Sequence, residues 1–229
     1  MATKILVVLT NIGVIPATGK PTGWDLACLA LPHSVLQEKV DFTFASPQGG
    51  LAPVDPASVE RATDHISKSF YSEKKGLWEN TTPVARFIGR AGEFDGVLYP
   101  GGHGSMFDLA SDNSSIQLIE EFWKAEKLVS GIGHGSIAFR LVKKSNGEPL
   151  FMGHCVAVFS DEEEKLLNMA EYIPYSLETT VKENGGNVVP AAQAWSSRVI
   201  SDGKLVTGQN SASGLALGKA IARTLGIDL

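Results

Sequence analysis

The chain has little cysteine and no long hydrophobic run. Two cysteines among 229 residues exclude a disulfide framework. The longest apolar-rich stretch, 24–31, contains Asp25 and ends at Pro32, so it cannot span a bilayer. The apolar run 5–9 is too short for the core of a signal peptide. These absences predict a cytoplasmic protein with no membrane partner.

Clustered positive charge is also scarce. The chain has 20 basic and 25 acidic residues and a net charge of -5. Nucleic-acid binding needs grouped lysine and arginine, and only two isolated lysine pairs occur, at 74–75 and 143–144. His33, His65 and His154 follow no metal-ligand spacing. We therefore expect no nucleic-acid partner, no metal and no cofactor.

Short apolar runs alternate with helical patterns along the chain. This alternation predicts an α/β protein with a mostly parallel sheet and helices on both faces. Residues 51–93 are the least periodic part, and we expect an insertion of two or three short helices over the sheet edge or over a pocket. No linker divides the chain, so a single domain over 1–229 is expected. Predicted strands cover 4–9, 41–45, 94–99, 128–132, 156–159, 188–189, 199–200 and 205–206, and predicted helices cover 24–38, 114–126, 137–142, 175–184 and 211–225.

Glycine-rich turns follow three of the predicted strands, at 11–23, 100–104 and 133–136. In open α/β sheets, ligands bind beyond the carboxyl ends of the strands. Gly102 and its neighbouring glycines let backbone amides face an anionic oxygen. The segment 128–135 reads as strand, sharp elbow and helix, an arrangement that normally presents a nucleophile at its apex.

Three segments, 97–104, 131–135 and 205–213, resemble the DJ-1/PfpI (ThiJ) superfamily, in the branch of glyoxalase III enzymes and related heat-shock chaperones. The resemblance implies a flavodoxin-like, class I glutamine amidotransferase-like three-layer sandwich and a homodimer. In that branch the elbow reads Cys-His-Gly-Pro. The cysteine attacks an aldehyde carbon, the histidine assists it, an acid orients the histidine, and a first-helix glutamate exchanges protons with thiol and substrate.

Two of these positions are retained. His134 matches the family histidine. Glu164 is placed like the orienting acid, with Asp161 or Glu163 as alternatives. His134 and Glu164 either form an acid–base pair or survive as a structural hydrogen bond, and we favour the acid–base pair because a buried polar pair is costly to keep unused.

Three other positions depart from the family. Gly133 stands at the cysteine, Cys28 at the glutamate and Ser136 at the proline. Glycine offers no nucleophile, although it adopts the elbow's backbone conformation without steric cost. Cys28 is either a relocated nucleophile or a small buried apolar group. Asp25 is either a general base or a carboxylate favoured by the helix dipole.

Five further residues complete the predicted site. We expect all of them to line a pocket or to hold an oxyanion. They are Trp24, Gly102, His103, Gly135 and Trp195.

Three functions are then possible. The first is a cofactor-free enzyme that acts on a small carbonyl or electrophilic metabolite by acid–base chemistry, as a lyase, hydratase or hydrolase. The second is a non-catalytic chaperone-like or ligand-binding relative. The third, by resemblance alone, is glyoxalase III activity, which converts methylglyoxal to lactate.

Overall fold

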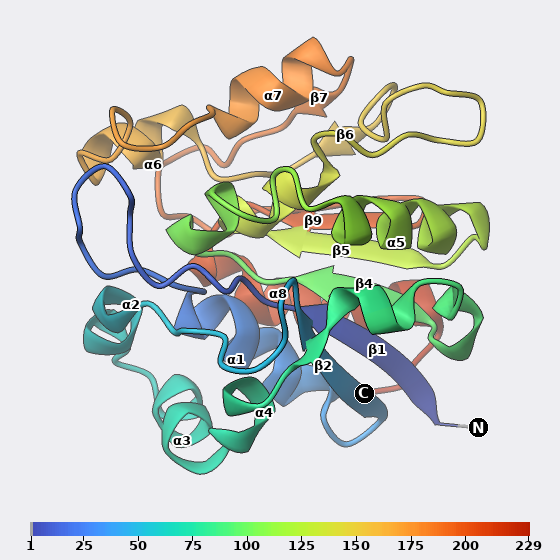
Figure 1. Cartoon of the computed structure of the whole chain (residues 1–229), viewed down its shortest axis with the longest axis horizontal. Coiled ribbons are helices and arrows are strands. Elements are labelled where there is room, and N and C mark those ends of the chain that lie inside the picture. Colours follow the sequence, from blue (N-terminus) through green and yellow to red (C-terminus); the bar gives the residue numbers. More distant parts are fainter. Residues whose placement is uncertain (1) are drawn as a thin grey trace.

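The computed structural model describes residues 2–229 and contains a central seven-stranded sheet (Figure 1). The strand order is β3-β2-β1-β4-β5-β9-β8, and only the β8–β9 pair is antiparallel. The expected mostly parallel sheet is therefore confirmed. Its strands are β1 (Thr3–Val8), β2 (Val40–Ser46), β3 (Thr82–Pro83), β4 (Gly96–Tyr99), β5 (Leu128–Ile132), β8 (Val199–Asp202) and β9 (Leu205–Gly208).

Helices cover both faces of this sheet. Alternate residues of β1 enter two different cores, since Ile5 and Val7 join one buried cluster and Leu6 joins the other. The first core lies under α1 (Leu26–Leu36) and α8 (Gly214–Leu225), and the second lies under α5 (Asn113–Lys124). This arrangement confirms the three-layer sandwich. No helix within residues 2–229 has the length and apolar character needed to cross a membrane.

Helix α1 is shorter than the helix predicted over 24–38. It begins at Leu26, because Asp25 caps it by accepting a hydrogen bond from the Cys28 N–H at 3.1 Å. Pro32 lies inside the helix and does not end it. Helix α8 packs closely against α1, as its small residues predict: a Cβ on Gly218 would lie 2.9 Å from the Val35 Cβ.

The predicted strand at 156–159 is wrong in extent and in placement. Only β6 (Cys155–Val156) is extended, and it pairs with β7 (Asn187–Val188) in a separate two-stranded sheet. The next backbone N–H, that of Ala157, donates to the Thr207 hydroxyl at 2.9 Å, and the chain soon enters α6 (Asp161–Leu166). Figure 1 shows α6 and α7 (Leu177–Glu183) at this end of the molecule.

The predicted insertion contributes to both the sheet edge and the site. It holds α2 (Pro56–Arg61), α3 (His65–Glu73) and α4 (Gly76–Glu79), whereas 84–87 forms a 3-10 turn. Strand β3 extends the sheet beyond β2. Asp55 and Arg61, at the two ends of α2, reach the cavity described below.

Candidate active site

A cavity of about 260 Å³ lies at the carboxyl ends of β4, β5 and β9. The turns that follow these strands contribute Gly102 and His103, Gly133 and His134, and Asn210 and Ser211. This is the edge at which a parallel sheet binds ligands. The remaining lining comes from Asp25, Cys28, Asp55, Arg61, Phe159, Leu167 and Trp195.

Gly133 forms the elbow directly after β5. Its φ of +56° lies in the left-handed region, which glycine adopts freely. A Cβ placed there would lie 3.8 Å from the Gly101 Cα and 3.9 Å from the Cys28 Sγ, which is ordinary contact distance. The strand–elbow–helix geometry therefore persists, and the space of a small side chain at its apex is open.

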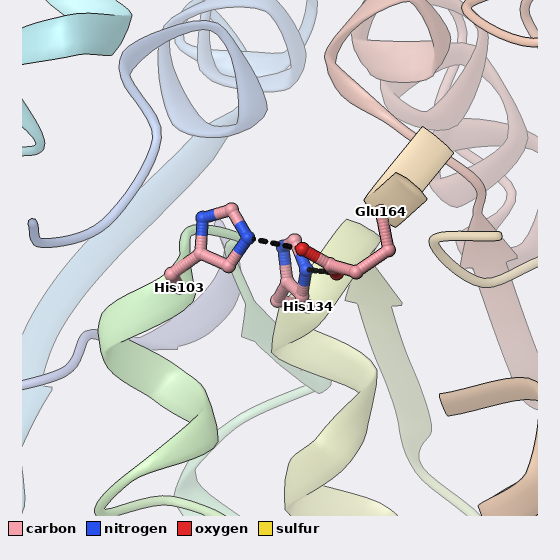
Figure 2. Close-up of side chains that lie close together, drawn as sticks. All are labelled: His103, His134 and Glu164. Atoms are coloured by element: carbon pink, nitrogen blue, oxygen red, sulfur yellow. Dashed lines mark hydrogen bonds and ion pairs between the residues drawn. The ribbon is translucent and has the colours of Figure 1, made fainter. Parts of the chain in front are cut away.

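Glu164 joins two imidazoles beside this elbow (Figure 2). One carboxylate oxygen accepts a hydrogen bond from the His134 Nε2 at 2.7 Å, and the other accepts from the His103 Nε2, also at 2.7 Å. The side chains of His134 and Glu164 are only 5% and 6% exposed. Of the three acids considered from the sequence, Glu164 is the one that contacts His134. The link to His103 was not predicted.

Burial and hydrogen bonding set the protonation of this cluster. Burial alone would raise the pKa of Glu164, but the hydrogen bonds from His103 and His134 hold it at about 2. Burial and the neighbouring His103 lower the pKa of His134. At neutral pH the cluster is thus a carboxylate with a neutral His134. Because Nε2 donates its proton to Glu164, Nδ1 is the nitrogen that keeps a free lone pair.

The same three side chains could in principle ligate a metal, since their ligand atoms lie within 4.8 Å of one another. Each imidazole nitrogen instead faces its own carboxylate oxygen at hydrogen-bond distance. A metal would have to displace both N–H protons from bonds that already satisfy the buried carboxylate. The contacts fit a hydrogen-bonded cluster, and we assign no metal to it.

Two backbone N–H groups can hold a negative oxygen. Those of Gly102 and His134 donate to no acceptor among residues 2–229, and both residues line the cavity. Gly102 has φ of +119°, and a Cβ there would lie 2.2 Å from the Gly23 carbonyl oxygen. Only glycine fits this position, and its unpaired N–H in the cavity lining can serve as an oxyanion donor.

Known proteins resemble this chain in sequence and in fold. No protein-family model matches the chain. The probable glutathione-independent glyoxalase hsp3104 of Schizosaccharomyces pombe is 30% identical over 208 residues, which cover 84% of this chain and 94% of that protein. The chain belongs to the DJ-1/PfpI superfamily. It falls in the glyoxalase III branch of that superfamily.

Solved structures agree with this assignment. The Rapid Encystment Protein 24 kDa of Francisella tularensis aligns with a TM-score of 0.90 and 29% identity, covering 97% of this chain and 99% of that one. Glyoxalase III of Candida albicans aligns with a TM-score of 0.87 and 21% identity over 97% of each chain, which shows the shared fold.

Cys28 lies at the DJ-1/PfpI cavity as a buried thiol, 3% exposed. Burial and the adjacent Asp25 carboxylate raise its pKa well above the ordinary value. A thiol with a raised pKa carries little thiolate at neutral pH, so it is a poor nucleophile. Asp25 is the N-cap of α1: one carboxylate oxygen accepts from the Cys28 N–H, and the other lies 3.5 Å from the Arg61 guanidinium. These contacts favour a structural role for Asp25 over a role as general base.

Two residues expected at the DJ-1/PfpI cavity are not among those that line it. Trp24 is fully buried, where its indole N–H donates to the Ala52 carbonyl at 2.9 Å and its ring meets Trp78 edge to face at 5.2 Å. Gly135 is also buried, and a Cβ there would lie 2.1 Å from the Tyr99 carbonyl oxygen. Both positions serve packing rather than lining.

Aromatic rings form one wall of the cavity. Phe159 packs against His134 with ring centroids 4.2 Å apart and against Trp195 at 5.8 Å. Trp195 is 43% exposed and holds φ of +64°, which is strained for a residue with a side chain. Trp195 was predicted to lie at the pocket, and in the structure it is one of the residues that line the cavity.

Glu163 was considered only as an alternative partner of His134, but the structure gives it other contacts. It is fully buried, and its carboxylate accepts from the Trp195 N–H at 2.8 Å and the Asn210 amide at 2.6 Å. Its other oxygen accepts from the Ser160 N–H and hydroxyl. The run of four acids at 161–164 hides this residue, because a surface helix start has the same composition.

Proposed function

We propose that this DJ-1/PfpI member is a cofactor-independent enzyme that moves a proton at the carbon beside the carbonyl of a small substrate. The observation that carries the proposal is a neutral His134, held by the Glu164 carboxylate at 2.7 Å, in a cavity without a thiol at its elbow. Two relatives are named as glutathione-independent glyoxalases, and these names support a small carbonyl substrate.

The chain's own residues can supply both the base and the oxyanion donors that this proton transfer needs. The His134 Nδ1 takes a proton from the α-carbon as the C–H bond breaks. The electron pair forms a C=C bond, and the carbonyl becomes an enolate oxygen. The N–H groups of Gly102 and His134 stabilise this oxygen, while Glu164 stabilises the imidazolium. Returning the proton, or expelling a β-substituent, completes an exchange or lyase reaction.

Proton exchange measured by NMR in deuterated water tests this proposal. With small ketones and hydroxyketones, we expect the protein to speed up the exchange of α-protons. His134→Ala should slow the catalysed exchange about 10²- to 10⁴-fold. His65→Ala, which removes an exposed histidine of α3, is the matched control and should leave the rate unchanged. Catalysed exchange that survives His134→Ala would remove His134 as the base.

Glyoxalase activity is the second candidate, and the names of the relatives favour it. Thiol addition would have to come from Cys28, whose buried thiol stays protonated at neutral pH. We expect essentially no lactate from methylglyoxal, and Gly133→Cys alone should not give full activity because the partner glutamate is also absent. Robust lactate formation that Cys28→Ser abolishes would establish this candidate instead.

A further inference from the structure

Three charged side chains meet at one side of the cavity, and the proposed function leaves them without a role. Asp25 caps α1 and Asp55 caps α2, each with one carboxylate oxygen. The second oxygen of each lies near the Arg61 guanidinium, at 3.5 Å and 3.6 Å. Two carboxylates thus flank a single cation on the lining of the cavity.

Asp55 is the most informative of the three. It is only 7% exposed, and burial raises its pKa. Its second oxygen makes no hydrogen bond to any residue in 2–229, because the Arg61 nitrogen at 3.6 Å is too far. This oxygen is not fully buried, and Asp55 lines the cavity, so the oxygen is open to a ligand there. The cavity therefore offers an unmet acceptor, next to a guanidinium that is 56% exposed and keeps free donors.

This mixed array selects the charge of a ligand. A carboxylate ligand would meet Arg61 but would be repelled by Asp25 and Asp55 together. An ammonium ligand would meet the aspartates but would be repelled by Arg61. A hydroxyl both donates and accepts, so it can donate to an aspartate oxygen and accept from the guanidinium at once. The array is complementary to an uncharged, hydroxylated compound.

Two other features of the cavity agree. The half-exposed Trp195 ring gives a flat apolar wall, and the partly exposed Ser211 adds a hydroxyl beside it. The volume of about 260 Å³ is below the range typical of drug-sized ligands. We propose that the cavity takes a small, uncharged, hydroxylated carbonyl compound, such as a short aldose or ketose. This inference rests on the proposed function, since it names the ligand of the same site.

Ligand-observed NMR titration of three ketones tests the inference. Dihydroxyacetone, acetone and pyruvate share a three-carbon ketone skeleton and differ in hydroxyl groups and charge. We expect dihydroxyacetone to bind at least about tenfold more tightly than either of the others, as expected when a site's polar groups are left unpaired by the analogue. Equal affinity for acetone, or tighter binding of pyruvate, would overturn the inference.

Matched substitutions locate the selectivity. Asp55→Asn keeps an oxygen to cap α2 but replaces the carboxylate oxygen that would accept from the ligand. Arg61→Leu removes the guanidinium that would donate to the ligand. Each substitution should lower the preference for dihydroxyacetone over acetone at least about fivefold. Asp64→Asn is the control, because Asp64 caps α3 in the same way but does not line the cavity. Arg86→Leu, at an exposed arginine outside the cavity, controls for lost charge. An unchanged preference in both test variants would refute the role of the charged array.

Binding and turnover separate this inference from the proposed function. If dihydroxyacetone binds selectively but no ketone exchanges its protons, the proposed catalysis fails and the ligand class stands. If acetone and dihydroxyacetone exchange equally well and bind equally well, the ligand class fails and the catalysis stands.

Discussion

Glu163 and Glu164 are neighbours in α6, and both are buried, yet they hold different parts of the site. Glu164 contacts two imidazoles, and its pKa is lowered to about 2. Glu163 contacts only neutral donors, from Ser160, Trp195 and Asn210. The comparison shows two tasks for a buried carboxylate. Glu164 influences the protonation of His134, whereas Glu163 holds the segments that form the cavity wall.

The largest expected effect comes from the carboxylate that touches the histidines. Glu164→Gln keeps the shape of the side chain but removes the charge that stabilises a protonated His134. We expect proton-exchange activity to fall about 10²- to 10⁴-fold, as happens when the acid behind a catalytic histidine is neutralised. Glu162→Gln, at an exposed neighbour in α6, should leave activity unchanged. Similar rates in both variants would show that Glu164 is structural.

Glu163→Gln should affect stability more than chemistry. A glutamine oxygen can replace one carboxylate oxygen, but its NH2 group would face donors that the second oxygen now accepts. We expect the free energy of unfolding to fall by about 3 kcal/mol, since buried donors are left unpaired. Urea denaturation measures this change, with Glu162→Gln expected within about 0.5 kcal/mol of the parent protein. A loss confined to turnover would assign Glu163 to the chemistry instead.

The pH dependence of stability should sharpen the contrast. The pKa of Glu164 is depressed from 4.5 to about 2 in the folded protein. The unfolded state therefore binds more protons between these values, and stability must fall as the pH falls. The contribution of Glu164, roughly 3 kcal/mol, is fully present above pH 4.5 and is lost as the pH falls through about 2. Urea titrations between these pH values should show a shallower slope for Glu164→Gln, and an identical slope would contradict the assignment.

The smallest effect concerns the strain that Glu163 helps to hold. Trp195 has φ of +64°, a conformation that glycine adopts freely and alanine does not. We expect Trp195→Ala to be less stable than Trp195→Gly by about 1 kcal/mol, which is the reverse of the usual order in regular structure. Thermal unfolding of the two variants measures the difference. Equal stability would mean that the backbone relaxes once the indole is gone.

Local patterns were enough to predict the parts of the molecule that depend on neighbouring residues. The elbow at Gly133 and the strand before it follow from the pattern of one segment. The place of Glu164 came from the family resemblance, which left Asp161 and Glu163 as alternatives. The link from Glu164 to His103 depends on how the turn after β4 meets α6, 61 residues further along the chain. No periodicity in the sequence encodes that distance.

Other predictions failed because one residue type serves several roles. Trp24 was assigned to the cavity beside Asp25, but its indole N–H is satisfied in the core by Ala52. Asp55 and Arg61 escaped notice because residues 51–93 have no regular pattern to place them. The run 156–159 has strand character, yet only Val156 pairs in a strand, and the Ala157 N–H donates to the Thr207 side chain instead of to a backbone carbonyl.

The open space at Gly133 has a consequence for any attempt to restore thiol chemistry by mutation. A cysteine introduced there would set its Cβ 3.9 Å from the sulfur of Cys28, which is ordinary contact distance. A thiol introduced at the elbow would therefore lie against a second thiol, and not against the glutamate that the family resemblance places in the first helix. Thiol chemistry at this elbow therefore requires two substitutions made together, one at Gly133 and one at Cys28.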